Sequence, residues 1–146
     1  MKKLIIVRHG SYDEMTHNLS TVGEQQAREL AERLRTHIVG TSLIVSSLAP
    51  RTRQTANIIA AELAITECVE SSDVGDVDDM GLPMRLVSNV RERCDTLILV
   101  THKPIVDHLP TRFSREQGLK IEVPIFWVCP ATGVVIDCEK AILTLV

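Results

Sequence analysis

The sequence predicts an α/β fold, a three-layer sandwich in which a mostly parallel central sheet carries helices on both faces. Two observations predict it. Between residues 3 and 109, short apolar runs typical of buried strands alternate with longer amphipathic stretches typical of helices. After residue 120, three short runs with strand-like composition follow one another, which indicates some antiparallel strands at the end of the chain.

The length of 146 residues allows one domain to bury a hydrophobic core without support from disulfides or metal ions. No linker-like stretch, internal repeat or low-complexity segment interrupts the chain. We therefore expect residues 1–146 to form a single domain.

The first strand and the first helix are predicted from the amino-terminal quarter of the chain. Lys3–Val7 has the apolar run of a short buried strand, and Leu19–Ile38 carries apolar residues along one face of a helix. Thr21, followed three residues later by Glu24, has the spacing of a capping box at the start of that helix.

The same alternation continues through the middle of the chain. Leu43–Ser46 predicts a second strand, and residues 51–64 predict a second amphipathic helix. The acidic, glycine-containing residues 71–81 predict a loop, and Pro83 suits the first turn of a helix that continues through Val90.

The last third begins with the clearest strand pattern, DTLILVTH at Asp95–His102. The KPIVDHL stretch after it predicts a helix with Pro104 near its first turn. Three short strands joined by turns at PATG and EK are then expected, at Ile121–Cys129, Val134–Asp137 and Ala141–Leu145.

Composition argues against several classes of partner. The formal net charge of −3 provides no overall attraction to nucleic acid or anionic lipid, so an anion site must be a local cluster of cations. The apolar run before Arg8 is too short for a signal segment or a membrane span, and we expect a cytoplasmic protein. Its four cysteines lack metal-site spacing, which predicts reduced thiols and no metal.

Cationic side chains follow three of the predicted strands. Arg8 and His9 end the first strand, Arg51 lies at the head of the helix after the second, and His102 follows the later TLILV run. In open parallel sheets, ligands bind outside the carboxyl ends of the strands. Arginine forks and helix starts are suited to phosphate oxygens, and Gly10 would let the backbone pass close to the bound group.

The two histidines suit nucleophilic catalysis at phosphorus. A neutral imidazole can attack the phosphorus atom while a protonated one stabilises charge on its oxygens. We expect His9 to be the nucleophile because its neighbour Arg8 should lower its pKa by repulsion between like charges. The hydroxyl of Ser11, directly after Gly10, is a further candidate donor to the phosphate.

Four blocks in order along the chain resemble the histidine phosphatase (phosphoglycerate mutase-like) superfamily. They are RHG, LSTVGEQQARELAERL, SSLAPRTRQTANII and LILVTHKPIVDHL. The resemblance implies a phosphoglycerate mutase-like fold, His9 as the residue that accepts the phosphoryl group, and Arg8, Arg51 and His102 as catalytic phosphate ligands. It implies no cofactor.

The small size, the GD pair at Gly75 and Asp76, and the His-x-Pro at His102 to Pro104 resemble the SixA-like branch of small phosphohistidine phosphatases. The acidic motif that supplies a proton donor in larger sugar-phosphate members is missing. A phosphorylated imidazole leaves readily without a strong general acid, which favours a phosphoramidate substrate. Among the carboxylates of residues 70–79, Asp76 is our candidate proton donor.

The predicted function is therefore a metal-independent phosphatase that works through a phosphohistidine intermediate, with phosphohistidine in a protein as its substrate. Two alternatives remain open: a phosphatase of a small phosphorylated metabolite, and a phosphate-binding module without turnover. No GxxxxGK[ST] loop, no cysteine followed six positions later by arginine, and no GxSxG elbow occurs, so the competing mechanisms are disfavoured. The sequence does not indicate an oligomeric state.

Overall fold

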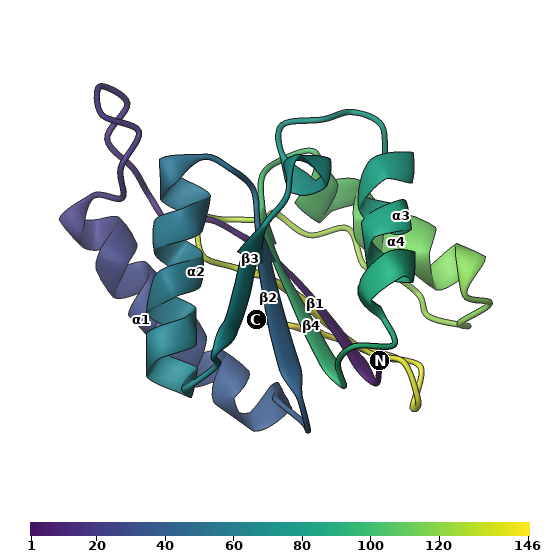
Figure 1. The fold of residues 1–146 in the computed structure, drawn as a ribbon. Helices are drawn as coiled ribbons and strands as arrows, with labels where there is room; N and C mark the ends of the chain where they lie inside the picture. Colours follow the sequence, from purple (N-terminus) through teal and green to yellow (C-terminus); the bar gives the residue numbers. More distant parts are fainter.

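The computed structural model describes residues 1–146 as a six-stranded sheet with helices on both faces (Figure 1). The strands are β1 (Lys3–Arg8), β2 (Ser42–Ser46), β3 (Glu67–Glu70), β4 (Thr96–Thr101), β5 (Gly133–Asp137) and β6 (Ile142–Leu145). Their order is β3-β2-β4-β1-β5-β6; the first four run parallel, and β5 and β6 are antiparallel to their neighbours. The predicted three-layer α/β sandwich is confirmed.

The helices divide into two pairs, one for each face of the sheet (Figure 1). They are α1 (Thr21–Leu34) with the short η1 (Arg35–His37), α2 (Pro50–Leu63), the short η2 (Ser72–Val74), α3 (Gly81–Val90) and α4 (Ile105–Glu116). Helices α1 and α2 cover one face, and α3 and α4 cover the other. No helix combines the length and the apolar character that crossing a bilayer requires.

Strand β1 shows how the two cores form. Successive side chains of a strand point to opposite faces, so a continuous apolar run feeds both layers. Leu4 and Ile6 lie in the core under α3 and α4, whereas Ile5 and Val7 lie in the core under α1 and α2. This double burial explains why the strand patterns in the sequence are continuous rather than alternating.

The start of α1 differs from the expectation by one residue. The N-cap is Ser20, whose Oγ accepts a hydrogen bond from Gly23 N at 3.1 Å, so the predicted capping box beginning at Thr21 is wrong. Ser20 is fixed there because its backbone N–H donates to the carbonyl oxygen of Ser11 at 3.0 Å. A long-range pairing therefore decides which residue ends the loop.

Two predictions about strands need correction. Residues Ile121–Cys129 form no strand, and the edge strand β3 at Glu67–Glu70 was not expected. Pro124 interrupts the apolar run and lacks an N–H, and the place beside β1 is taken by β5. β3 has no apolar run of its own and forms through its pairing with β2.

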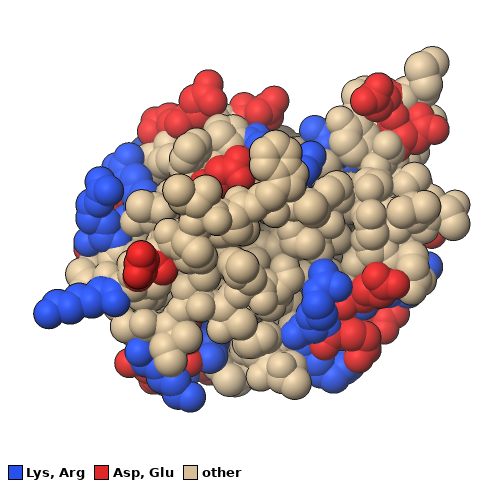
Figure 2. All heavy atoms as spheres, turned by 180° about the vertical axis from the view of Figure 1, so that it is seen from behind, with Lys and Arg blue, Asp and Glu red and all other residues tan.

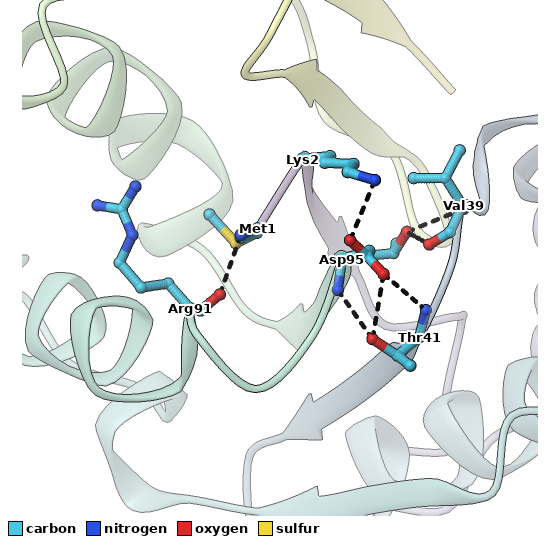
Figure 3. Close-up of polar contacts among 7 residues, drawn as sticks. Met1, Lys2, Val39, Thr41, Arg91 and Asp95 are labelled. Atoms are coloured by element: carbon cyan, nitrogen blue, oxygen red, sulfur yellow. Dashed lines mark hydrogen bonds and ion pairs between the residues drawn. The ribbon is translucent and has the colours of Figure 1, made fainter.

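Asp95, which directly precedes β4, connects the amino-terminal ends of the parallel strands through its side chain (Figure 3). Its carboxylate lies 3.3 Å from Lys2 Nζ and accepts a hydrogen bond from Thr41 N at 3.1 Å. Gly40, with φ of +54°, passes so close to this carboxylate that a Cβ atom would overlap it. These contacts join the first residues of β1, β2 and β4, at the ends of the strands opposite those that carry the predicted site.

Candidate active site

The register of the strands brings the predicted histidines together. His9 N donates to the carbonyl oxygen of Thr101 at 3.2 Å, so the residue after β1 lies beside the end of β4. The imidazole rings of His9 and His102 are 5.2 Å apart between centroids, at an angle of 60°. Only 4% of His9 and 5% of His102 is exposed.

The hydrogen bonds of His9 define its tautomer. Nδ1 lies 2.8 Å from the carbonyl oxygen of Gly10, and Arg51 Nε donates to Nε2 at 3.3 Å. Because a carbonyl only accepts and a guanidinium only donates, Nδ1 carries the proton and Nε2 keeps its lone pair. The nitrogen that faces Arg51 is therefore the free nucleophilic atom.

The pKa of His9 is lowered from 6.5 to about 4. Burial of the ring is the largest cause, and the charges of His102, Arg51 and Arg8 lower the pKa further, while the bond to Gly10 opposes them. The expected direction of the shift is found, but its main cause is loss of solvent rather than repulsion from Arg8. His9 is neutral at physiological pH.

Arg51, in the first turn of α2, lies between the two imidazoles. Besides its bond to His9, its Nη2 is 3.3 Å from His102 Nδ1. Its guanidinium carbon lies 4.6 Å from the ring centroid of Tyr12, and the same ring meets His9 edge-on at 5.4 Å. Tyr12 is a site residue that the sequence analysis missed, since an isolated aromatic in a loop has no recognisable pattern.

A buried chain of hydroxyl groups lies behind His102. Its Nε2 is 2.6 Å from Ser47 Oγ, which is 2.6 Å from Thr52 Oγ1, and Thr52 in turn donates to the carbonyl oxygen of Ala49 at 2.8 Å. With Arg51 donating to Nδ1, the ring proton lies on Nε2 and points at Ser47. Ser47 and Thr52 were also missed; their only signal is that Ser47 directly follows a buried strand and Thr52 lies in the first turn of the next helix.

The pKa of His102 is also lowered from 6.5 to about 4. Burial is again the largest cause, followed by the charge of Arg51, with Arg8 adding a smaller effect. Asp76 acts in the opposite direction and raises this pKa. A negatively charged ligand would favour the protonated ring in the same way as Asp76 does.

Arg8 borders the site from the other side. Its Nη1 donates to the carbonyl oxygen of Val128 at 3.1 Å, and its Nε is buried without a partner. Arg8 therefore has N–H groups not used by the protein, and its charge lowers the pKa of both His9 and His102.

Ser11 and Gly10 are held by the protein itself. Ser11 bonds through its backbone, donating to Gln26 Oε1 at 2.8 Å and accepting from Ser20, and its hydroxyl has no partner. A Cβ atom on Gly10 would lie 2.6 Å from the carbonyl oxygen of Gly23. The glycine is therefore needed for the close approach of α1, in addition to the role beside a bound group that the sequence predicts.

A hollow of about 290 Å³ opens beside His102 and Arg51, and Asp76 lines it. The loop that carries Asp76 is held to the sheet because Thr101 Oγ1 donates to the carbonyl oxygen of Val74. Two of the other acidic candidates are engaged elsewhere: Glu70 pairs with Arg53 at 3.6 Å, and Asp79 accepts from Gly81 N at the start of α3. No group of three or more potential protein ligands is arranged to hold a metal ion.

The family profile of the "Histidine phosphatase superfamily (branch 1)" matches residues 4–81, which include His9, Arg51 and the strands and helices that carry them. The chain belongs to this superfamily. This histidine phosphatase is thus a phosphate-releasing hydrolase. No curated protein matches its sequence significantly.

Solved structures agree on the fold of this histidine phosphatase. The protein histidine phosphatase SixA complexed with tungstate is 20% identical, with a TM-score of 0.72 over 99% of this chain and 94% of the other. A mycobacterial glucosyl-3-phosphoglycerate phosphatase complexed with VO3 is 16% identical, with a TM-score of 0.72 over 99% of this chain and 97% of the other. At these identities the likeness establishes the fold, and two different phosphatases share it.

Proposed function

We propose that His9 Nε2 attacks the phosphorus atom of a phosphorylated substrate and becomes transiently phosphorylated. The observation that carries this proposal is the unprotonated Nε2 of His9, held beside Arg51 and 5.2 Å between ring centroids from His102. In the first step a bond forms between Nε2 and phosphorus as the bond from phosphorus to the leaving group breaks. Nδ1 keeps its proton and donates a hydrogen bond to the carbonyl oxygen of Gly10, which stabilises the positive ring.

The arginines and His102 are proposed to hold the phosphoryl oxygens. Without substrate, Arg51 donates hydrogen bonds to both imidazoles. When the phosphoryl group binds, the same N–H groups donate to its oxygens instead, and Nε2 of His9 becomes free to attack. Arg8 adds the N–H groups that no protein atom uses. His102, held from behind by Ser47, takes up a proton in the field of the dianion and donates through Nδ1.

Water completes the cycle. It attacks the phosphorylated His9, the bond from phosphorus to Nε2 breaks, and the electron pair returns to that nitrogen. Asp76, which lines the hollow beside His102, is our candidate to accept the proton of this water and to protonate a poor leaving group in the first step. No step requires a metal ion, and no metal-ligand cluster is built here.

The proposed substrate is phosphohistidine in a protein. An imidazole whose other nitrogen is protonated leaves phosphorus as a neutral group, so it needs little help from the exposed Asp76. The likeness to SixA, named a protein histidine phosphatase, supports this choice. A small phosphorylated metabolite is the second candidate, because the glucosyl-3-phosphoglycerate phosphatase has the same TM-score of 0.72.

The deciding experiment compares a chromogenic aryl phosphate with a protein phosphorylated on histidine, both in the presence of EDTA. We expect turnover of both, and loss of both in His9→Ala but not in the control His108→Ala, which changes an exposed side chain of α4. Acid-labile radioactive phosphate should remain on the wild-type chain after rapid quenching and be absent from His9→Ala.

The other outcomes identify the alternatives. Turnover of metabolite esters without turnover of the phosphoprotein indicates a metabolite phosphatase. Vanadate binding without any turnover indicates a binding module, and strict dependence on a divalent metal contradicts the mechanism. Asp76→Asn should slow esters of poor leaving groups about tenfold or more while affecting the phosphoprotein little.

A further inference from the structure

We propose that residues 120–128 bind an extended segment of the phosphorylated protein, alongside the residue that carries the phosphoryl group. This inference rests on the proposed function, since it requires a polypeptide substrate. It assigns a role to most of Ile121–Cys129, which the sequence predicted as a strand and which forms none in the structure.

The segment borders the catalytic pocket at two points. The carbonyl oxygen of Val128 accepts the hydrogen bond from Arg8 at 3.1 Å. Lys103, the residue after His102, places its Nζ 4.4 Å from the ring centroid of Trp127. A chain bound along residues 120–128 is thus continuous with the place where phosphate is proposed to bind.

A hollow of about 310 Å³ separates the segment from α4. Residues 123–128 form one wall, and Lys103, Asp107 and Thr111 lie on the other. Lys103 is also 3.8 Å from Asp107, so its charge is partly balanced and its position over Trp127 is supported from both sides. The hollow is a groove next to the active site with one apolar and one polar side.

The backbone of the segment has almost no partners within the protein. Residues 120–128 make no hydrogen bond to another backbone group, and the contact of Val128 with Arg8 is the one bond that their carbonyl oxygens accept. An extended peptide can satisfy successive N–H and C=O groups by adding as a strand. A sugar phosphate or a nucleotide cannot do so, which favours a polypeptide as the occupant. Because Pro124 has no N–H, pairing is expected over residues 125–127.

The side chains of the segment alternate in the way that such binding requires. Phe126 packs against the core and Val128 is buried, whereas Ile125 and Trp127 are 106% and 81% exposed. Seen from behind, the molecule shows charged side chains mainly toward its rim and uncharged residues across much of its centre (Figure 2). Exposed Trp127 beside an exposed aliphatic residue is typical of an anchor in a protein interface.

The experiment uses full-length protein and two probes, both phosphorylated on histidine with phosphoramidate. One is a short peptide with leucines flanking the phosphohistidine, and the other is phosphohistidine with blocked termini. We expect a kcat/KM for the peptide about tenfold or more above that for the single residue. The double variant Ile125→Ala/Trp127→Ala should lose this preference through KM, with kcat/KM for the single residue unchanged.

Two measurements make the test specific. The control variant Ile142→Ala, which removes an exposed apolar side chain from β6, should keep the preference for the peptide. In His9→Ala, which binds without turnover, the amides of residues 125–127 should exchange more slowly with deuterium when the phosphorylated peptide is added. This protection reports backbone pairing directly.

Each adverse result has a distinct meaning. If the wild-type protein hydrolyses the peptide without preference, or the double variant retains the preference, the docking proposal is wrong and the proposed function stands. An equal loss for both probes would mean that the segment shapes the catalytic pocket instead. Dissociation of a dimer by the double variant would assign the surface to a second copy. Failure of the wild type on both probes, with turnover of aryl phosphate, would overturn the phosphohistidine function itself.

Discussion

Ser47 Oγ lies 2.6 Å from His102 Nε2, at the point where two neighbouring parallel strands end. Both side chains are buried, so the bond is protected from water. Because Arg51 donates to Nδ1, the ring proton lies on Nε2, and Ser47 accepts the hydrogen bond from it while Nδ1 faces the proposed phosphate site.

Replacing Ser47 by alanine should impair both catalysis and the stability of the fold. The change leaves the buried N–H of His102 without an acceptor, which should lower the free energy of unfolding by about 1–3 kcal/mol. We expect kcat/KM for aryl phosphate to fall about 10- to 100-fold. Ser47→Thr, which retains the hydroxyl, should recover part of the activity. Nitrogen NMR of the His102 ring should show a shifted Nε2 resonance in the alanine variant, because that N–H loses its acceptor, and an unaltered ring spectrum would exclude this role.

The pKa values of the two histidines can be tested by NMR titration of the rings. Both are lowered from 6.5 to about 4, mainly by burial, so both rings should stay neutral well below pH 6. Arg51→Met should raise both pKa values, because the charge of Arg51 contributes to each shift. A ring that titrates near 6.5 in the wild-type protein would contradict the buried, neutral site.

The same shifts affect stability. Between pH 6.5 and about 4, the unfolded chain takes up protons at His9 and His102 that the folded chain does not. Above pH 6.5 both states hold these two rings neutral, so the rings should not make the free energy of unfolding depend on pH. As the pH falls from 6.5 toward 4, they should lower that free energy. Urea unfolding of wild type and His9→Asn across this range should show a shallower pH dependence for the variant.

Tyr12 is expected to act through its ring. The guanidinium of Arg51 lies over that ring, 4.6 Å from its centroid, and such contacts stabilise by about 0.5–2 kcal/mol. Tyr12→Phe should keep near wild-type kinetics, whereas Tyr12→Leu should raise the KM for aryl phosphate about 3- to 30-fold. Equal losses in both variants would indicate that the hydroxyl, and not the ring, is required.

Asp95 is expected to support folding without affecting chemistry. Hydrogen bonds from Thr41 and the contact with Lys2 hold the pKa of Asp95 below 3.8, so its stabilising effect is complete above pH 3.8 and is lost as the pH falls through the folded value. Asp95→Asn should lower the Tm at pH 7, and the difference from wild type should shrink in acid. Catalysis at low temperature should be unchanged, because Asp95 lies at the opposite edge of the sheet.

The sequence alone determined the layers of this protein and the residues that meet at their edge. Continuous apolar runs identified β1, β2 and β4, and His9, Arg51 and His102 followed from their positions after these strands. This was possible because hydrophobic periodicity is local, and because parallel strands bring their carboxyl ends to one edge whatever their order.

Only the tertiary structure decided the contacts that depend on residues distant in the chain. It showed that Arg51, more than Arg8, contacts His9, that Tyr12 and Ser47 complete the site, and that residues 121–129 remain outside the sheet. Burial, tautomer and strand pairing each arise from neighbours that the sequence pattern does not identify. The physical reason is that the protonation of a side chain and the partner of a strand depend on burial and on neighbouring residues, and both are set only when the layers pack together.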